Sequence, residues 1–105
     1  MSYRLRFHPA ASADLNAILN WIAGYSGVRT AERRLAEIEA AITSLKATPH
    51  IGSIRDDIAP GLRAIPAGRK AVVAFVVDDE QREVLIYAVS YAGADWVGRS
   101  RARGR

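Results

Sequence analysis

The apolar residues of this chain change their spacing once, close to residue 50, and this change limits the folds that the chain can adopt. Before residue 50 they recur every three or four positions, which is the period of an amphipathic helix. After residue 60 they form short runs rich in β-branched residues and bounded by turn residues, as in strands. The spacing therefore predicts helices in the first half of the chain and most strands in the second half.

One short strand is expected before the helices. Tyr3, Leu5 and Phe7 alternate with polar residues, which is typical of a strand with one buried face. Pro9 ends this strand and suits the first turn of a helix, where its missing N–H costs nothing.

Two helices are predicted, one from Pro9 to about Ala23 and one from Thr30 to about Ala47, with Thr30 as the N-cap of the second. Each helix has one apolar stripe, and the short glycine-containing turn between them favours an antiparallel hairpin. The stripe residues expected to be buried are Leu15, Ile18, Ile22, Leu35, Ile38 and Ile42.

Three further strands are predicted over residues 62–66, 69–77 and 84–91, with residues 78–81 as a hairpin turn. The run 69–77 is nearly all apolar and β-branched, which favours a central position in the sheet. The order strand, helix, helix, strand, strand, strand predicts an α+β fold. In this fold the N-terminal helix hairpin packs on one face of an antiparallel sheet.

The composition fits one small domain and excludes several kinds of site. A chain of 105 residues with 50% hydrophobic residues has room for one core but not for two. The absence of cysteine excludes disulfides and thiolate metal ligands, and it suits a reducing cytoplasm. The two histidines, His8 and His50, lie far apart, so neither a zinc site nor a cofactor is expected. The apolar runs are too short to span a bilayer, and we expect a cytoplasmic protein without a membrane partner.

The net charge of +4 comes from the C-terminus. Lys and Arg number 15 against 11 Asp and Glu, and four of the arginines follow the last acidic residue, Asp95. Residues 1–98 are therefore neutral, which argues against sequence-specific DNA binding, because DNA readers carry positive charge on a folded face. We expect residues 1–98 to form a single domain and residues 99–105 to form a flexible basic tail. That tail is either a solubilising end or a segment that binds a partner.

No catalytic motif stands out in this sequence. No serine lies in a nucleophile elbow, neither histidine has an acidic neighbour, and no glycine-rich loop joins a strand to a helix. Asp56 and Asp57 are adjacent, so their side chains diverge and favour a turn over an acid–base pair. The sequence predicts no catalytic residue and no metal site.

Four cations of the predicted sheet and its turns form a candidate binding site: Arg63, Arg69, Lys70 and Arg82. Hairpin geometry is expected to bring several of them together. Cations on a sheet bind RNA phosphates, or acidic groups of a protein partner, through charge-assisted hydrogen bonds. The alternative is that they are edge-strand charges that discourage aggregation or pair with nearby acids.

Several blocks of the sequence resemble ParE-type toxins of the ParE/RelE superfamily. They are the opening YRLRFHPAASADLNAILNWIA, then LKATPHIGSIRDDI, PGLRAIPAGRKAVVAFVV and VLIYAV, and together they extend over about residues 3–91. Their order and spacing are more specific than any one block. The most telling positions are Pro9, Asp14 with Leu15, Pro49, Gly52, the run Pro60–Arg63, and Gly68 with Arg69.

The resemblance implies the same α+β fold and one of two activities. RelE-type members are ribosome-dependent mRNA endonucleases that use several basic residues and a C-terminal tyrosine, whereas ParE-type members bind DNA gyrase and poison it without being nucleases. The segment from Ser90 to Trp96 has no His or Arg, which relatives of both branches commonly place there. Cleavage of RNA needs groups that activate the 2′-hydroxyl and stabilise charge on the phosphate, so their loss disfavours a nuclease. We therefore expect a gyrase-poisoning toxin that is not an enzyme, with an mRNA endonuclease or a degenerate, non-toxic binding module as alternatives.

A cognate antitoxin is the partner that the resemblance implies, in a hetero-oligomer with the toxin. Val72, Ala74 and Val76 are expected to leave an apolar patch on the face of the sheet away from the helices, with arginines at its rim. Such a patch suits an acidic, amphipathic antitoxin segment. Tyr87 and Tyr91 are expected to share one face with Val89, as packing or interface aromatics. The residues expected to bind the antitoxin or target are Arg63, Arg69, Lys70, Arg82, Tyr87, Tyr91 and Trp96.

Overall fold

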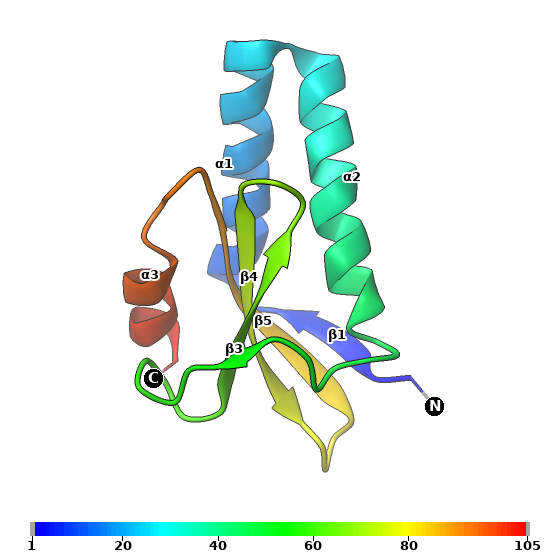
Figure 1. Ribbon diagram of the computed structural model, residues 1–105, viewed down its shortest axis with the longest axis vertical. Coiled ribbons are helices and arrows are strands. Elements are labelled where there is room, and N and C mark those ends of the chain that lie inside the picture. The colour runs from blue at the N-terminus through cyan, green and yellow to red at the C-terminus, as the bar shows by residue number, and fades with distance from the viewer. Residues whose placement is uncertain (1, 105) are drawn as a thin grey trace.

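The computed structural model describes residues 2–104, which form three helices and five strands (Figure 1). In chain order these are β1 (Arg4–Phe7), α1 (Pro9–Ser26), α2 (Val28–Ser44), β2 (Ser53–Ile54), β3 (Leu62–Ala67), β4 (Ala71–Asp78), β5 (Glu83–Tyr91) and α3 (Trp96–Arg103). The predicted α+β class and the order of the predicted elements are confirmed, and β2 and α3 are additions to them. No helix within residues 2–104 is long and apolar enough to cross a membrane.

The two long helices form the predicted hairpin, but each is longer at the turn than expected (Figure 1). Gly27 alone separates them, with a φ of +93°, a left-handed conformation that glycine adopts without steric cost. Thr30 therefore lies inside α2 and is not its N-cap. Because α1 ends at Ser26 and α2 begins at Val28, the chain reverses its direction at this single glycine.

The five strands form one mixed sheet in the order β1-β5-β4-β3-β2. Neighbouring strands from β2 to β5 are antiparallel, but β1 runs parallel to β5, with Arg4 opposite Glu83. The prediction of an antiparallel sheet is therefore wrong for β1. Alternating side chains indicate a half-buried strand but not the direction of its partner, and a parallel partner needs a long connection such as residues 8–82.

An irregularity in β5 changes which of its side chains face the helices. Between Ala74 and Phe75 of β4 the partner position moves by two residues in β5, which leaves Tyr87 as the extra residue of a bulge. Val89 and Tyr91 consequently pack with the core under the helices, whereas Tyr87 packs on the opposite face. The prediction that all three share one face is wrong, because one extra residue shifts the alternation of side chains.

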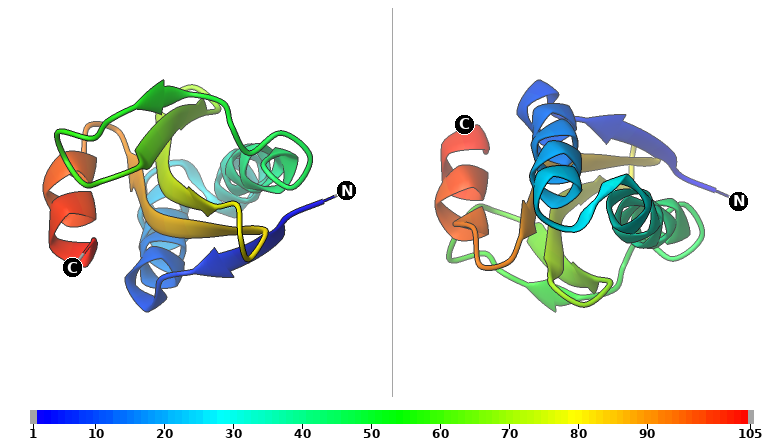
Figure 2. Two further views of the ribbon diagram at one scale, coloured as in Figure 1. Left: turned by 90° about the horizontal axis from the view of Figure 1, so that it is seen from below. Right: turned by 90° about the horizontal axis from the view of Figure 1, so that it is seen from above.

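The main core lies between the helix hairpin and one face of the sheet; Figure 2 shows α1 and α2 together, with α3 apart from them. Four residues of the predicted helix stripes are buried as expected, namely Ile18, Ile22, Ile38 and Ile42. The other two, Leu15 and Leu35, are half-buried. On the sheet side, Val73, Phe75 and Ile86 are fully buried in this core.

A second, smaller cluster covers the other face of the sheet. Ala74 of β4 is fully buried there, under Ile58 and Ala59 of the loop before β3 and against Trp96 and Val97 of α3. The prediction of an open apolar patch on this face is therefore wrong. The loop before β3 and the helix α3 bury much of the apolar surface that the sequence predicts as an antitoxin site.

The basic segment after residue 98 is a folded helix and not a flexible tail as far as Arg103, so that prediction is wrong for residues 99–103. The Asp95 side chain caps α3 by accepting a hydrogen bond from the Gly98 N–H at 2.9 Å. Ser100 of α3 is fully buried. Arg105, the last residue of the expected tail, lies outside the described residues.

Candidate functional site

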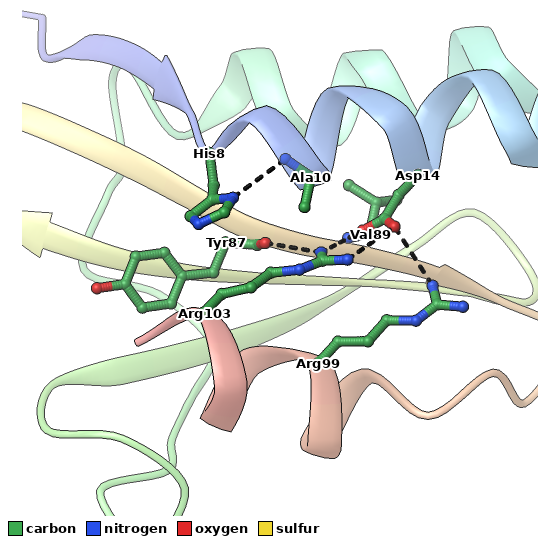
Figure 3. Close-up of polar contacts among 7 residues, drawn as sticks. All are labelled: His8, Ala10, Asp14, Tyr87, Val89, Arg99 and Arg103. Carbon is green, nitrogen blue, oxygen red and sulfur yellow. Dashed lines mark hydrogen bonds and ion pairs between the residues drawn. The ribbon is translucent and has the colours of Figure 1, made fainter. Parts of the chain in front are cut away.

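One carboxylate, that of Asp14 in α1, joins three elements of the fold (Figure 3). Its Oδ2 atom accepts a hydrogen bond from the Val89 N–H at 3.0 Å and another from the Arg103 guanidinium at 2.6 Å. A second nitrogen of Arg103 lies 3.1 Å from Oδ1, which makes this pair bidentate. Arg99, four residues earlier on α3, adds a longer contact of 3.5 Å. We call Asp14, Val89, Arg99 and Arg103 the Asp14 clasp.

The clasp is mostly removed from water. The side chains of Asp14 and Arg103 are 9% and 15% exposed, whereas that of Arg99 is 40% exposed. A carboxylate in such a place loses most of its hydration, and this loss is offset only by well-placed donors. One backbone N–H and two guanidinium groups supply them, so the buried charge is matched.

The clasp also binds the backbone of β5 beyond the part that β1 covers. The pairing between β1 and β5 reaches only Ile86. Past it, the Val89 N–H donates to Asp14, and the Tyr87 carbonyl accepts a hydrogen bond from Arg103 at 2.9 Å. Side chains from α1 and α3 therefore satisfy the backbone groups of β5 that lie beyond the end of β1.

The sheet separates the four cations that were expected to cluster. Arg69 and Lys70 lie exposed in the turn between β3 and β4. Arg82 lies in the turn at the other end of β4, and a strand of eight residues is about 23 Å long. Arg63, half-buried in β3, donates to the Ile51 carbonyl at 3.4 Å. The expectation that hairpin geometry gathers these cations is therefore wrong: Arg63 lies at the Arg82 end of the β3–β4 pair, and Arg69 and Lys70 lie at the other end.

Arg82 belongs to a separate polar cluster, which joins the N-terminal segment, the loop after α2 and the β4–β5 turn. Its guanidinium lies 6.0 Å from the centre of the Tyr3 ring. The Tyr3 hydroxyl donates to Asp79 Oδ1 at 2.7 Å, and His50 Nε2 lies 2.8 Å from the same oxygen. The hydrogen bond to the Asp79 carboxylate raises the pKa of Tyr3, and the same bond lowers the pKa of Asp79.

The three aromatic candidates have packing contacts in three different places. The ring of Tyr87 meets His8 edge-on at 6.5 Å, and Trp96 lies under the Arg55 guanidinium at 5.4 Å. Tyr91 meets Trp21 of α1 edge-on at 5.9 Å. Tyr91 lines two surface pockets, and Trp21 lines both of them as well.

The sequence analysis missed the clasp as a site, although the sequence contains a signal for it. Asp14 falls in the stripe of α1 that buries Ala11 and Ile18, and a carboxylate at a buried helical position needs a cationic or N–H partner. Arg99 and Arg103 are four residues apart, which places them on one face of a helix. The helix itself was not predicted, so these two arginines were assigned to a tail.

The sequence analysis also missed Trp21 and Tyr25, which are four residues apart on the outer side of α1. Their rings stack in parallel at 5.6 Å, and they are 54% and 80% exposed. A pocket of about 320 Å³ lies beside Trp21, between α1 and the segment that follows β5. Trp21 and Tyr25 continue the face of α1 that carries Asp14 and Ile18, and two large aromatics at its exposed end were the available signal.

The arrangement suits binding more than catalysis. Arg99 and Arg103 of α3 contact a carboxylate of the same chain, and the tyrosines of β5 pack against other side chains. Across residues 2–104, no three His, Asp or Glu side chains come close enough together to hold a metal ion. What the described surface does offer is exposed aromatic area flanked by cations.

Residues 5–96 match the family model of the ParE toxin of type II toxin–antitoxin systems, parDE. The chain belongs to the ParE toxin family. Toxin ParE1 of Mycobacterium tuberculosis is 41% identical over 68 residues, which cover 65% of this chain and 69% of that relative. The family match extends from β1 to the first residue of α3, so it includes Asp14 and Val89 but neither arginine of the clasp.

Solved structures of ParE and RelE systems share the fold of this ParE-family chain. The chromosomal ParDE toxin–antitoxin system of P. aeruginosa has a TM-score of 0.73 at 23% identity, covering 86% of this chain and 96% of that one. The RelBE2 toxin–antitoxin complex of Mycobacterium tuberculosis has a TM-score of 0.62 at 21% identity, covering 87% and 99%. A mutant of the E. coli toxin RelE in the free state has a TM-score of 0.66 at 19% identity, covering 97% and 96%. At such identities these likenesses show the fold alone.

The Asp14 clasp predicts a large and specific loss of stability when its carboxylate is removed. In Asp14→Ala, the partly buried Arg103 loses its counter-charge, and we expect the free energy of unfolding to fall by about 3 kcal/mol or more. Chemical denaturation measures this change. The matched control is Arg101→Gln, which removes an exposed arginine of the same helix and should change stability by less than about 0.5 kcal/mol. A fall in Asp14→Ala no larger than that of the control would contradict the clasp.

The Tyr3–Asp79 hydrogen bond predicts a titration change in Asp79→Asn. The raised pKa of Tyr3 means that this bond stabilises the fold below the ordinary tyrosine pKa and is lost as the pH rises through the raised value. The lowered pKa of Asp79 means that the bond persists at neutral pH and is lost as the pH falls through that lowered value. In Asp79→Asn, the pKa of Tyr3 should therefore return toward about 10.

Phenolate absorbance follows this titration, and the difference between the wild type and Tyr3→Phe identifies the contribution of Tyr3. Asp78→Asn is the matched control, because the Asp78 side chain accepts a hydrogen bond only from the Gln81 N–H among the contacts of residues 2–104. It should leave the Tyr3 titration unchanged. An unchanged Tyr3 titration in Asp79→Asn would show that the hydrogen bond does not form in solution.

Proposed function

We propose that this ParE-family toxin binds DNA gyrase, stabilises the cleaved DNA complex and so arrests growth, and that a cognate antitoxin neutralises it. Membership of the ParE family is the observation that carries the proposal, since residues 5–96 match that family. The toxin acts in the cytoplasm, where gyrase works, and it catalyses no reaction of its own.

The scarcity of free basic residues near the last strand supports a toxin that acts by binding over one that cleaves RNA. Between β5 and α3 the chain reads Ala92-Gly93-Ala94-Asp95, without a cation. Of the two arginines that face the sheet, Arg103 is held by Asp14 in a bidentate pair, whereas Arg99 makes one longer contact of 3.5 Å and stays 40% exposed. A ribonuclease needs cations free to stabilise the phosphate and an acid or base within hydrogen-bond reach of the 2′-hydroxyl.

The second candidate function is a RelE-type mRNA endonuclease, because this chain shares its fold with the E. coli toxin RelE. Tyr87 and Tyr91 are the tyrosines that a nuclease site on β5 would use. Both are half-buried against other aromatic rings, which favours a packing role over proton transfer. A degenerate toxin that only binds an antitoxin is the third candidate.

The partner proposed for this toxin is an antitoxin, with which it forms a hetero-oligomer. Two of the proteins that share its fold come from toxin–antitoxin systems, the ParDE system of P. aeruginosa and the RelBE2 complex of Mycobacterium tuberculosis. Of the residues proposed for binding, Lys70 and Tyr91 lie together beside the exposed aromatics of α1. Arg63, Arg69, Arg82, Tyr87 and Trp96 are proposed as further contacts at other places on the sheet.

The test is the effect of the purified protein on supercoiling by gyrase. We expect supercoiling to be inhibited and cleaved DNA to accumulate, because the toxin holds the covalent gyrase–DNA intermediate open. Cells that express it should induce the DNA-damage response before their mRNA declines. Addition of the antitoxin encoded beside the toxin gene is the control, and it should restore supercoiling.

Other results would select the other candidates. Site-specific cuts in mRNA on translating ribosomes, with supercoiling intact, would overturn gyrase poisoning in favour of the endonuclease. A protein that binds its antitoxin but leaves gyrase, mRNA and growth unaffected would be the degenerate module.

A further inference from the structure

An exposed aromatic surface lies on the outer side of α1, and it consists of Trp21, Tyr25 and Tyr91. Trp21 is at the centre, since it stacks on Tyr25 and meets Tyr91 edge-on. The exposed fractions of Trp21 and Tyr25, 54% and 80%, are high for side chains of this size. Large aromatics that gather at the surface are typical of interfaces, where they provide most of the binding energy.

Two pockets flank this aromatic surface and share Trp21 and Tyr91 as a common wall. The larger, of about 320 Å³, lies between α1 and the segment after β5 and has Ile18 and Ala94 in its lining. The smaller, of about 110 Å³, lies toward α2 and the β3–β4 turn. The larger pocket is mainly apolar, and the smaller one is partly polar, with Ser26 and Thr30 in its lining. Together they suit one apolar and one polar side chain of a docked helix, three or four residues apart.

The charges around the two pockets are mainly positive. Arg99 lines the larger pocket, and Lys70 and Arg34 line the smaller one. Asp14 is the acidic residue of the larger pocket, but the clasp engages both of its oxygens. Lys70 has no ion pair with any residue in the range 2–104, and Arg34 has only a 3.7 Å contact to Glu37. The surface therefore has cations available for an acidic partner.

We propose that this aromatic surface binds an acidic, amphipathic segment of the antitoxin, with an apolar side chain in the larger pocket and carboxylates toward Lys70 and Arg99. The inference rests on the proposed toxin–antitoxin function and adds the place and the chemistry of recognition. It moves the docking site from the far face of the sheet, which α3 and the loop before β3 cover, to the outer side of α1. Burial of the aromatic rings supplies affinity, and the cations set the orientation of the segment.

The same observations disfavour two other occupants. A second copy of this chain, docked through the same surface, would bring Lys70 and Arg99 against identical cations. A single-stranded nucleic acid needs aromatic faces free for stacking along a continuous basic groove, but Trp21 and Tyr25 already stack on each other. A peptide segment with acidic residues has side chains for the pockets and carboxylates that complement the positive charge of Lys70 and Arg99.

The test measures the affinity of the full-length toxin variants for the purified antitoxin by isothermal titration calorimetry. We expect Trp21→Ala to weaken binding about tenfold or more, because a central aromatic residue is removed. Tyr25→Ala, at a more exposed position, should weaken binding by a smaller factor and provides a second variant if Trp21→Ala fails to fold. The control is Ile54→Ala, which truncates an apolar side chain of similar exposure, 57%, at the β2 edge of the sheet. It should bind like the wild type.

The contribution of positive charge to antitoxin affinity is tested by a matched pair of variants. Lys70→Glu should weaken binding about three- to tenfold, with a larger effect at low salt, because it reverses a charge at the rim. Lys46→Glu, at an exposed lysine just after α2 and at the opposite end of the helix hairpin, makes the same exchange and should have no effect.

The outcomes separate this inference from the proposed function. If the wild type binds the antitoxin and the Trp21, Tyr25 and Lys70 variants bind equally well, the docking surface is wrong and the proposed function stands. If the aromatic variants lose affinity only to the extent that the Ile54 control does, the inference also fails. If the wild type does not bind the antitoxin, the neutralisation mechanism and this inference are both overturned.

Discussion

The bond between the Asp14 carboxylate and Arg103 determines how the C-terminal third of this molecule is arranged. It connects α1 to α3 across β5, and the same carboxylate binds the Val89 N–H beyond the end of β1 (Figure 3). Because β1 pairs with β5 only as far as Ile86, backbone groups of β5 beyond it would lack partners on that side, at a cost of about 1–3 kcal/mol for each buried group. With the clasp in place, the Val89 N–H and the Tyr87 carbonyl have hydrogen-bond partners, and the Asp14 charge is paired with Arg103.

The clasp has two consequences for function. It holds α3 against the second face of the sheet, where Trp96 and Val97 cover Ala74. It also engages Arg103 in a bidentate pair, so this cation is not free for a ligand near β5. The largest side chains that stay exposed are the aromatic rings of Trp21 and Tyr25 on α1. These exposed rings are a surface suited to binding another protein, in agreement with the proposal of a toxin that binds its target.

The helix hairpin was predictable from the sequence because its signal is local. Ile18, Ile22, Ile38 and Ile42 repeat at helical spacing and are buried as expected. The direction of β1, the bulge at Tyr87 and the cover over Ala74 depend on contacts between distant segments, and no local pattern encodes them. The same holds for the site: Asp14 lies 85 and 89 residues from its arginines. Its buried position in α1 indicated that a partner was needed, but not which one.

Native-state hydrogen exchange at the Val89 amide tests the central role of the clasp most directly. The account predicts slow exchange in the wild type, with an opening free energy close to that of global unfolding, as for the core amides of β4. Arg103→Gln should accelerate exchange at Val89 more than at Val73, because Asp14 then loses its bidentate partner and holds the amide less firmly. Exchange at Val89 as fast as at the exposed Gly93, or unaffected by Arg103→Gln, would contradict the account.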